Sequence, residues 1–376
     1  MRPINILASV LKIIVGGVFL FSAVSKFVTI DAFEMYVYSF GFLPMGLCFY
    51  LSRVLIGAEL IMGIALISHR NHRFTLITSL LFLLFFVGFL VYAQLIGRTD
   101  SCHCFGDLLP FNPVQSILKN AILILVLLFV YKYGNHEWSP RWWLLAIIYL
   151  LLTAVFTFYT AKALHAIDPL SWVMMAVSLA VAILASFRFY SRWYVTAVLV
   201  MAPIVTTFIL SPPDSWYFGE GDTRYDEELL MAQLEAPDVD VITTDSIVDF
   251  DPTTMKGALY GEGLDRGRHL VAFFSPTCGY CRLAAEKIST IVARNDISHE
   301  SILFVFPAGS DEAKYRDFYE QTHSPIYPEV RIDRNLFVHI TRAAFPIILL
   351  IDNGVITASY SYRAIDEGEI TDFLTD

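Results

Sequence analysis

Long apolar runs, separated by short polar segments, fill the first 211 residues of the chain. A helix needs roughly 20 mainly apolar residues to cross the hydrocarbon core of a bilayer. Seven segments have this character, of which the sixth is short but almost uncharged: 4–28, 44–67, 74–96, 114–133, 142–161, 169–187 and 192–211. The pattern predicts a multi-pass α-helical membrane domain, a helical bundle of about seven spans.

The pattern changes after residue 211, where Pro212 and Pro213 begin an acidic, poorly patterned stretch. We interpret residues 212–236 as an acidic linker with one short helix, at 225–235. From 237 to 376, short apolar runs alternate with helical segments, which is typical of a βαβ unit followed by an antiparallel hairpin. The predicted strands are 269–274, 301–306, 328–332, 346–351 and 355–361, and the predicted helices are 279–293, 311–321, 334–341 and 366–374.

Composition separates the same two regions. The whole chain is 56% apolar and only 16% charged, whereas soluble domains carry about 25% charged residues. Residues 1–211 hold seven acidic and 13 basic residues, and the remainder holds 29 acidic and 13 basic residues. Because phosphate binding needs a basic surface, the acidic second region argues against nucleic acid as a partner. The first region is expected to contact the lipid bilayer.

Basic residues in the short loops predict the orientation in the membrane. With the N-terminus in the cytoplasm, seven Lys and Arg residues lie on the cytoplasmic side, against two to four on the other side. Seven spans then place residues 237–376 outside, together with the loop at 97–113. We therefore expect a protein of the bacterial inner membrane, with a cytoplasmic N-terminus and a periplasmic or otherwise extracytoplasmic C-terminal domain.

Four of the five cysteines form two close pairs, one in each region. Cys102 and Cys104 flank His103 in the outer loop, where two thiols one residue apart can close a small, strained ring. Strained disulfides are the labile, oxidising ones, which favours a redox pair. A structural disulfide and a metal site with His103 as third ligand are the alternatives, although no second Cys/His cluster completes four ligands.

The second pair, Cys278 and Cys281, follows a predicted strand and begins a predicted helix. Backbone N–H groups and the macrodipole stabilise a thiolate at a helix N-terminus. Two intervening residues allow the second sulfur to reach back to a mixed disulfide. We expect Cys278 to be the nucleophile and Cys281 the resolving cysteine. A zinc ribbon needs a second Cys or His pair, so we expect no metal here.

Two charged residues lie inside the predicted spans at matching depth. Lys12 and Glu59 are each eight residues from the inner end of their span, and neighbouring antiparallel helices share depth. Charges within a span are costly and need partners. We therefore expect an intramembrane ion pair that sets the helix register, with a proton relay or a quinone site as the alternative.

Three segments resemble the DoxX/MauE group of four-helix membrane proteins: G-G-V-F-L-F-S-A-V-S-K-F at 16–27, E-L-I-M-G at 59–63 and C-H-C-F-G at 102–106. The resemblance covers residues 1–135 and implies a four-helix membrane domain. MauE-type members are linked to the maturation of methylamine dehydrogenase, whose small subunit is rich in disulfides. Three additional transmembrane helices, within 136–211, lie outside the resemblance. His103 departs from the small residue that is frequent between the two cysteines.

Residues 237–376 resemble the thioredoxin fold, in which a C-x-x-C pair lies between a strand and a helix. A cis-proline loop faces the pair in this fold, and Phe345-Pro346, before the strand I-I-L-L-I, fits that loop. The resemblance implies an exported thioredoxin-like domain with a cis peptide bond at Pro346. Its substrate groove would be formed by Phe345, Pro346, Gly279 and Tyr280.

Two residues depart from thioredoxin itself. Thr277 stands where thioredoxin has a tryptophan, and Ala272 stands where it has a buried aspartate. Loss of that base argues against fast thioredoxin-style reduction. The Gly279-Tyr280 dipeptide is similar to that of some isomerase-type or oxidant-type exported relatives.

Together the two pairs predict a membrane-bound thiol–disulfide oxidoreductase that relays electrons between the outer-loop pair and the thioredoxin-like domain. Its partners are exported proteins with cysteine thiols or disulfides. We favour the oxidising direction because the spans contain no further cysteine pair to carry electrons across. Oxidation needs an electron sink, for which a quinone is the candidate cofactor, as in vitamin K epoxide reductase-like enzymes. The alternatives are a reductase of the same topology, a maturation factor dedicated to one client, and a membrane anchor with a structural loop.

Overall fold

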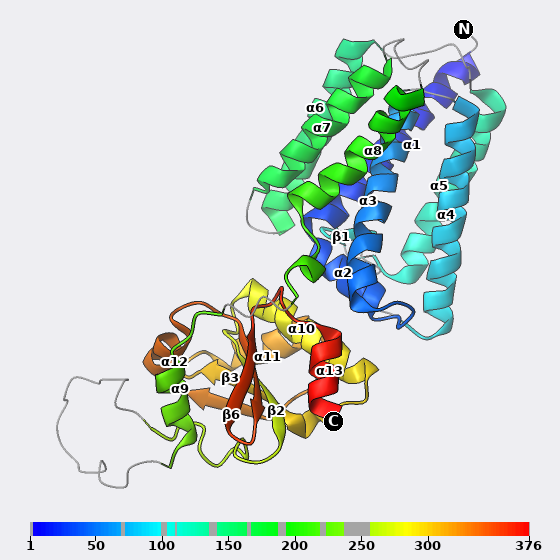
Figure 1. The fold of residues 1–376 in the computed structure, drawn as a ribbon. Helices are drawn as coiled ribbons and strands as arrows, with labels where there is room; N and C mark the ends of the chain where they lie inside the picture. The colour runs from blue at the N-terminus through cyan, green and yellow to red at the C-terminus, as the bar shows by residue number, and fades with distance from the viewer. Residues whose placement is uncertain are drawn as a thin grey trace. The chain divides into compact units, whose positions relative to one another are not determined.

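The computed structural model describes residues 3–68, 72–98, 104–109, 111–134, 141–163, 167–186, 193–218, 223–236 and 256–375 (Figure 1). Contacts between Cα atoms divide the chain into two compact units. The membrane unit comprises Met1–Val37 and Leu47–Pro213, and the C-terminal unit comprises Tyr38–Gly46 and Asp214–Asp376. Each unit has a hydrophobic core of its own.

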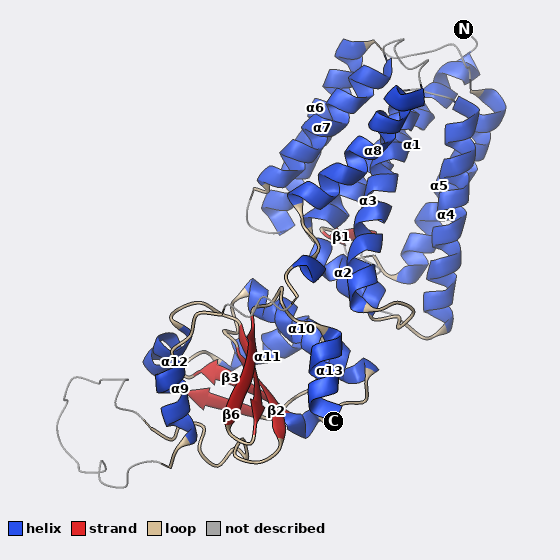
Figure 2. Cartoon of the chain, viewed as in Figure 1, coloured by secondary structure: helices blue, strands red, loops and turns tan. Residues whose placement is uncertain are grey.

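Helices make up almost all of the membrane unit (Figure 2). Among the described residues, five helices are long and apolar enough to span a bilayer: α1 (Pro3–Val28), α3 (Met45–Ile67), α4 (His72–Leu95), α5 (Pro113–Tyr133) and α6 (Trp142–Ala163). Two further helices, α7 (Pro169–Ser186) and α8 (Trp193–Leu210), contain shorter apolar stretches. Each of the seven predicted spans thus corresponds to a helix, and the predicted helical membrane domain is confirmed.

A short helix that the sequence pattern did not predict, α2 (Ile30–Tyr38), lies between α1 and α3. Its Glu34 is buried and forms an ion pair with Arg53 of α3. The Arg53 guanidinium also donates to the backbone carbonyls of Ser211, at 2.6 Å, and Pro212, at 2.9 Å. One buried arginine therefore joins α2, α3 and the chain that leaves α8.

The predicted pairing of Lys12 with Glu59 is wrong, because α1 and α3 pack in a different register. These helices approach closely at two glycines, since a Cβ added to Gly16 would lie 3.0 Å from the carbonyl oxygen of Gly63. Glu59 then faces the C-terminal half of α1, where the Nζ of Lys26 is 2.9 Å from both of its carboxylate oxygens. Lys12 lies roughly 21 Å from Lys26 along the helix axis, too far to share this carboxylate.

The C-terminal unit is built on one sheet with the strand order β4-β3-β2-β5-β6 (Figure 2). Its strands are β2 (Arg268–Phe273), β3 (Ile302–Pro307), β4 (Glu329–Ile332), β5 (Ile347–Asp352) and β6 (Val355–Tyr360). β2, β3 and β4 are parallel, whereas β5 is antiparallel to both β2 and β6. Helix α10 (Gly279–Arg294) connects β2 to β3. A βαβ unit, a hairpin and a C-x-x-C pair at the β2–α10 junction confirm the predicted thioredoxin fold.

Helices cover the sheet on both faces (Figure 1). Helix α10 contacts α11 (Glu312–Thr322) and α13 (Glu367–Thr375), and α12 (Arg334–Thr341) contacts α9 (Glu227–Leu234). Side chains alternate along the strands, so that Val271 and Phe273 of β2 join the core formed with α9 and α12. The intervening Ala272 points to the opposite face.

Helix α9 lies within residues 212–236, which the sequence pattern assigned to a linker. Its Leu229 and Leu230 are buried in the same core as Val271. The short helix predicted at 225–235 is therefore present as α9, but it belongs to the core of the C-terminal unit and not to a linker. Residues 237–255, at the start of the predicted thioredoxin-like domain, lie outside the described part of the chain.

Candidate functional site

The Cys278/Cys281 pair lies where the chain passes from β2 to α10. Cys278 is the N-cap residue of α10, with an extended backbone at φ −86° and ψ 122°. Apolar residues recur at helical spacing behind it and hold one face of α10 in the core: Cys281, Ala284, Ala285, Ile288, Ile291 and Val292. This anchoring leaves Cys278 half-buried at the start of the helix, whereas Cys281 is fully buried.

Contacts at the start of α10 lower the pKa of Cys278 to about 6. The largest contribution is the hydrogen bond that the Cys281 thiol donates to the Cys278 sulfur. Backbone N–H groups of Cys281 and Tyr280 and the positive charge of Arg282 act in the same direction, against the effect of partial burial. Cys278 is therefore mainly a thiolate at neutral pH, as expected for a sulfur at a helix N-terminus.

Burial has the opposite effect on Cys281 and raises its pKa far above the ordinary value of a thiol. The hydrogen bond to Cys278 and the negative charge there add to this rise. The backbone N–H of Ser275 donates to the Cys281 Sγ at 3.3 Å. This hydrogen bond lowers the pKa of Cys281 and offsets the rise only in part. The pair is thus asymmetric, with an accessible thiolate beside a buried thiol, which is the arrangement that a nucleophile and a resolving cysteine need.

The Phe345-Pro346 loop lies next to Cys278. Its peptide bond is cis, as predicted, and the carbonyl oxygen of Phe345 is 4.0 Å from the Cys278 Sγ. The Phe345 ring packs on Phe337 of α12, with ring centroids 5.9 Å apart. The structure therefore brings the four residues of the predicted groove around one sulfur, although they come from two distant segments: Gly279, Tyr280, Phe345 and Pro346.

An aromatic pair, which sequence reasoning missed, extends the surface beside Cys278. Tyr280 is 56% exposed and stacks on Tyr362, with ring centroids 4.8 Å apart. The Tyr362 carbonyl accepts a hydrogen bond from Lys287 at 3.1 Å, and its hydroxyl accepts one from Arg363 at 2.8 Å. Tyr362 belongs to no motif and is far from Tyr280 in the sequence, so only the folded chain reveals the pair.

The core beneath the pair differs from that of thioredoxin. Ala272 is fully buried in β2, in register with Phe304 of β3 and Ile348 of β5, so no carboxylate occupies this position. The buried charged residue of α10 is Lys287, which forms an ion pair with the buried Asp214. Because Asp214 precedes α9, this ion pair joins the beginning of the C-terminal unit to the helix that carries the cysteines.

Of the Cys102/Cys104 pair, the structure describes only Cys104, since Cys102 and His103 lie outside the described residues. Cys104 begins the short strand β1 (Cys104–Asp107), is buried, and accepts a hydrogen bond from Ser22 of α1 at 2.9 Å through its carbonyl oxygen. Gly106 has a φ of +55°, and a Cβ there would lie 2.6 Å from the carbonyl oxygen of Ser25. The glycine of the C-H-C-F-G motif thus lets β1 lie directly against α1.

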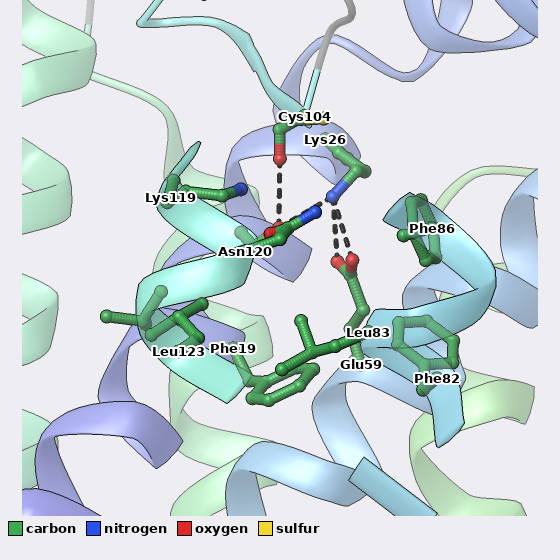
Figure 3. Close-up of a pocket in the computed structure, with 12 residues that line it drawn as sticks. Phe19, Lys26, Glu59, Phe82, Leu83, Phe86, Cys104, Lys119, Asn120 and Leu123 are labelled. Carbon is green, nitrogen blue, oxygen red and sulfur yellow. Dashed lines mark hydrogen bonds and ion pairs between the residues drawn. The ribbon is translucent and has the colours of Figure 1, made fainter. Parts of the chain in front are cut away.

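A buried polar cluster surrounds this end of α1 (Figure 3). The Lys26 ammonium donates to Ser22 at 2.6 Å and to both oxygens of Glu59. Helical side chains lean toward the helix N-terminus, which places the Lys26 ammonium one turn back, beside Ser22. Cys104 and Asn120 lie next to the cluster (Figure 3). Glu59 therefore belongs to the surroundings of Cys104, a link that the predicted partner Lys12 had obscured.

Among the residues that the structure describes, no group of three or more His, Cys, Asp or Glu side chains can hold a metal ion. The predicted alternative of a metal at Cys102, His103 and Cys104 falls on residues outside this set.

The chain is similar to known proteins in both of its units. The family model for methylamine utilisation protein MauE matches residues 4–133. Protein TlpB of Flavobacterium psychrophilum is 24% identical over 338 residues, which cover 83% of this chain and 79% of TlpB.

Two solved structures resemble the C-terminal unit in part. The thioredoxin domain of a thiol-disulfide oxidoreductase from Bacteroides vulgatus is 19% identical, with a TM-score of 0.24, and the match covers 30% of this chain and 81% of that domain. A secreted Mycobacterium tuberculosis disulfide oxidoreductase is 16% identical, also with a TM-score of 0.24, over 32% of this chain and 87% of its own. The chain is thus a membrane protein whose residues 4–133 are similar to the MauE family, joined to a thioredoxin-fold domain with a C-x-x-C centre of the thiol–disulfide oxidoreductase type.

Proposed function

We propose that this protein is a membrane-bound thiol–disulfide oxidoreductase that exchanges disulfides with exported proteins through Cys278 and Cys281. The observation that carries this proposal is the asymmetry of the pair: the pKa of Cys278 is lowered to about 6 and that of the buried Cys281 is raised. The cis-proline loop beside Cys278 offers backbone groups to an extended client peptide, which would bind as an additional strand.

The proposed reaction oxidises the client. A client thiolate attacks the Cys278–Cys281 disulfide at Cys278, and Cys281 leaves, giving a mixed disulfide between client and Cys278. A second client thiolate then attacks the client's own sulfur and releases Cys278, so that the client gains a disulfide and the pair gains two electrons. The low pKa of Cys278 favours this release, because a more acidic thiol is a better leaving group.

The pKa of Cys278 also bears on direction. Nucleophilic cysteines of this fold have pKa values of roughly 7 in a reductive member and roughly 3.5 in a strongly oxidising one, and Cys278, at about 6, lies between them. A stabilised thiolate makes the reduced state more favourable and the disulfide more oxidising. Together with Ala272 in place of a buried carboxylate, this supports the oxidising direction over a reductase of the same topology.

The second step of the proposal returns the electrons to the membrane unit. The Cys102/Cys104 pair reoxidises Cys278 and Cys281 through a second mixed disulfide. This step needs both pairs on one side of the bilayer, and the helices support that requirement. Three long helices, α1, α3 and α4, precede the loop, and seven precede the C-terminal unit. Both numbers are odd, so with seven spans both pairs lie opposite the N-terminus, in an extracytoplasmic space such as the periplasm.

Trapping of mixed disulfides tests the proposal. In the full-length protein in its own membranes, Cys281→Ser should leave Cys278 joined to client proteins, visible as larger species that a reductant removes. Combined with Cys104→Ser and treated with a mild thiol oxidant, which removes the two electrons, it should also yield a Cys102–Cys278 adduct. The matched control is Cys278→Ser, which keeps Cys281 but removes the nucleophile. If Cys281→Ser forms no more adducts than this control, the protein is not a thiol–disulfide oxidoreductase.

The MauE match over residues 4–133 favours a second candidate, a maturation factor dedicated to one exported client. Such a factor would act once per client and would not turn over a generic substrate. Catalytic oxidation of an unrelated reduced peptide by the full-length protein separates the two, because only the general enzyme should oxidise many equivalents.

A further inference from the structure

One arginine side chain holds the turn that precedes the cysteine pair of the C-terminal unit. Arg282 follows Cys281 on α10, and its guanidinium donates twice to the backbone carbonyl of Pro276, from Nε at 3.3 Å and from Nη2 at 3.1 Å. Pro276 is buried in the turn between β2 and Cys278. Two donors of one rigid fork fix the position of an acceptor better than a single donor does. Arg282 therefore fixes this turn against α10.

The other side of the guanidinium is anchored on α11. Nη2 of Arg282 lies 3.1 Å from a carboxylate oxygen of Asp317, and Nη1 donates to the side-chain oxygen of Gln321. The Gln321 amide donates in turn to Asp317 at 2.8 Å. Only 28% of the Arg282 side chain is exposed, and connected, sheltered ion pairs hold their geometry better than isolated surface pairs. We call these four residues the Arg282 clamp: Pro276, Arg282, Asp317 and Gln321.

The turn that the clamp holds contacts both cysteines. The backbone N–H of Ser275 donates to the Cys281 Sγ at 3.3 Å, and the Ser275 carbonyl accepts from the backbone N–H of Cys278 at 3.1 Å. The ring of Pro276 fixes its own φ, so a fixed Pro276 carbonyl also restricts the orientation of Ser275. The clamp thus reaches the Cys281 sulfur through the backbone.

Arg282 also acts on Cys278 by its charge. The hydrogen bond from the Cys281 thiol is the main cause of the lowered pKa of Cys278, and the positive charge of Arg282 adds to it. From α11, the negative charge of Asp317 partly offsets that of Arg282. The Phe345-Pro346 loop faces Cys278 with a backbone carbonyl, and the aromatic pair adds phenols, which titrate well above neutral pH.

We propose that Arg282 is a positioning residue for client oxidation, which prepares both sulfurs of the pair to leave as thiolates. The proposal rests on the proposed function. When a client thiolate attacks Cys278, the S–S bond breaks and its electron pair stays on Cys281, to which the fixed Ser275 N–H donates. When the second client thiolate attacks the client sulfur, the electron pair of the mixed disulfide stays on Cys278, near the charge of Arg282. A more stable leaving thiolate makes each step faster.

The test uses the full-length protein in lipid nanodiscs with Cys102→Ser and Cys104→Ser, which leaves Cys278 and Cys281 as the only close pair. The oxidised protein is mixed with a reduced peptide that contains two cysteines. Acid quenching and mass spectrometry follow one turnover at several peptide concentrations. Arg282→Gln should lower the maximal rate at least about tenfold, the effect of lost hydrogen bonds from a charged group. The half-saturating peptide concentration should not change, because the clamp lies within the domain.

Arg282→Lys separates the charge from the clamp. Lysine keeps the positive charge but lacks the planar fork, so the maximal rate should fall about as far as in Arg282→Gln. The pH midpoint of Cys278 alkylation in the reduced protein should stay near that of the parent, about 6. In Arg282→Gln the midpoint should move upward. A merely structural role would change neither midpoint.

Two substitutions on α11 make the test independent of folding defects at Arg282. Asp317→Asn keeps the size of the side chain and weakens the anchor, so the maximal rate should fall by about threefold. The alkylation midpoint should not move upward, because Arg282 remains. Arg316→Gln is the matched control, because Arg316 is 74% exposed and pairs with Glu320 at 3.9 Å. It should oxidise the peptide at the parent rate, and thermal melting shows whether each variant is folded.

Three outcomes would overturn the proposal. One is a parent-like maximal rate in both Arg282→Gln and Arg282→Lys. The second is an equal loss of rate in Arg316→Gln, which would show a general effect of charge. The third is a raised half-saturating concentration with an unchanged maximal rate, since Arg282 would then bind the client. A parent chain that does not oxidise the peptide at all would instead contradict the proposed function.

Discussion

Cys278 and Cys104 have surroundings of different origin, one local in the sequence and the other assembled from distant helices. The reactivity of Cys278 is tuned by neighbours in the chain, namely the Cys281 thiol, two backbone N–H groups and Arg282. The surroundings of Cys104 come from distant helices, with Ser22 and Lys26 from α1, Glu59 from α3 and Asn120 from α5. The first centre is therefore a property of one strand–helix junction, and the second depends on the whole bundle.

This difference predicts that the two centres can be disabled separately. Cys278→Ser should abolish disulfide exchange between the full-length protein and a reduced peptide, because Cys278 is the one cysteine among the described residues that is not buried. Cys104→Ser should leave a single turnover of that exchange intact and stop only repeated turnover. Stopped-flow measurement of the first turnover and steady-state oxidation of the same peptide check both expectations. Loss of the first turnover in Cys104→Ser would mean that the centres are not separable.

The next largest effect concerns the ion pair near Cys104. Glu59→Ala leaves the buried Lys26 ammonium unpaired and should reduce the free energy of unfolding by about 3–5 kcal/mol. Replacing both residues by methionine should recover most of the loss, because no buried charge remains. Denaturation in detergent, followed by circular dichroism, measures both. Equal instability of the single and double variants would show that packing, not charge, is responsible.

The pH dependence of alkylation tests the lowered pKa of Cys278. The pKa of Cys278 is lowered to about 6, so its rate of alkylation should rise with pH up to about 6 and level off above it. Cys281→Ala removes the hydrogen bond to the sulfur and should move the midpoint upward. Glu59→Ala should not move it. A midpoint near the ordinary thiol value of roughly 8.5 would contradict the described geometry.

The lowered pKa of Cys278 also determines how the stability of the reduced protein changes with pH. The folded state lowers the pKa of Cys278, so the Cys278 thiolate stabilises the folded protein. This stabilisation is fully present above the thiol pKa of the unfolded chain, roughly 8.5. It is lost as the pH falls through about 6. The melting temperature of the reduced protein relative to Cys278→Ser should therefore decline over that interval on acidification.

The smallest predicted effect concerns the aromatic pair beside Cys278. Tyr362→Ala removes a stacking contact worth about 0.5–1.5 kcal/mol, and we expect the KM for a client peptide to rise by up to about tenfold. Tyr362→Phe keeps the ring and loses only the hydroxyl, so its KM should stay close to that of the parent. An unchanged KM in both variants would remove Tyr362 from the client-binding surface.

Sequence patterns predicted what is local and missed what depends on packing between distant segments. The strands, the helices and the C-x-x-C junction follow from periodicity and from residues within one turn of each other. The partner of Glu59 does not, because the close approach of Gly16 and Gly63 sets the register of α1 against α3. Helix α2 was missed because it is too short for a membrane span. The place of α9 in the core becomes clear only in the folded chain, where Leu229 and Leu230 pack with residues of β2.

The most direct test of the proposed relay is the redox state of Cys278 and Cys281 in growing cells, read by rapid acid quenching and alkylation. We expect the pair to be mostly oxidised in the parent protein. It should accumulate in the reduced form when Cys102 and Cys104 are both replaced by serine. A pair that stays equally oxidised without the outer-loop cysteines would contradict electron transfer between the two centres.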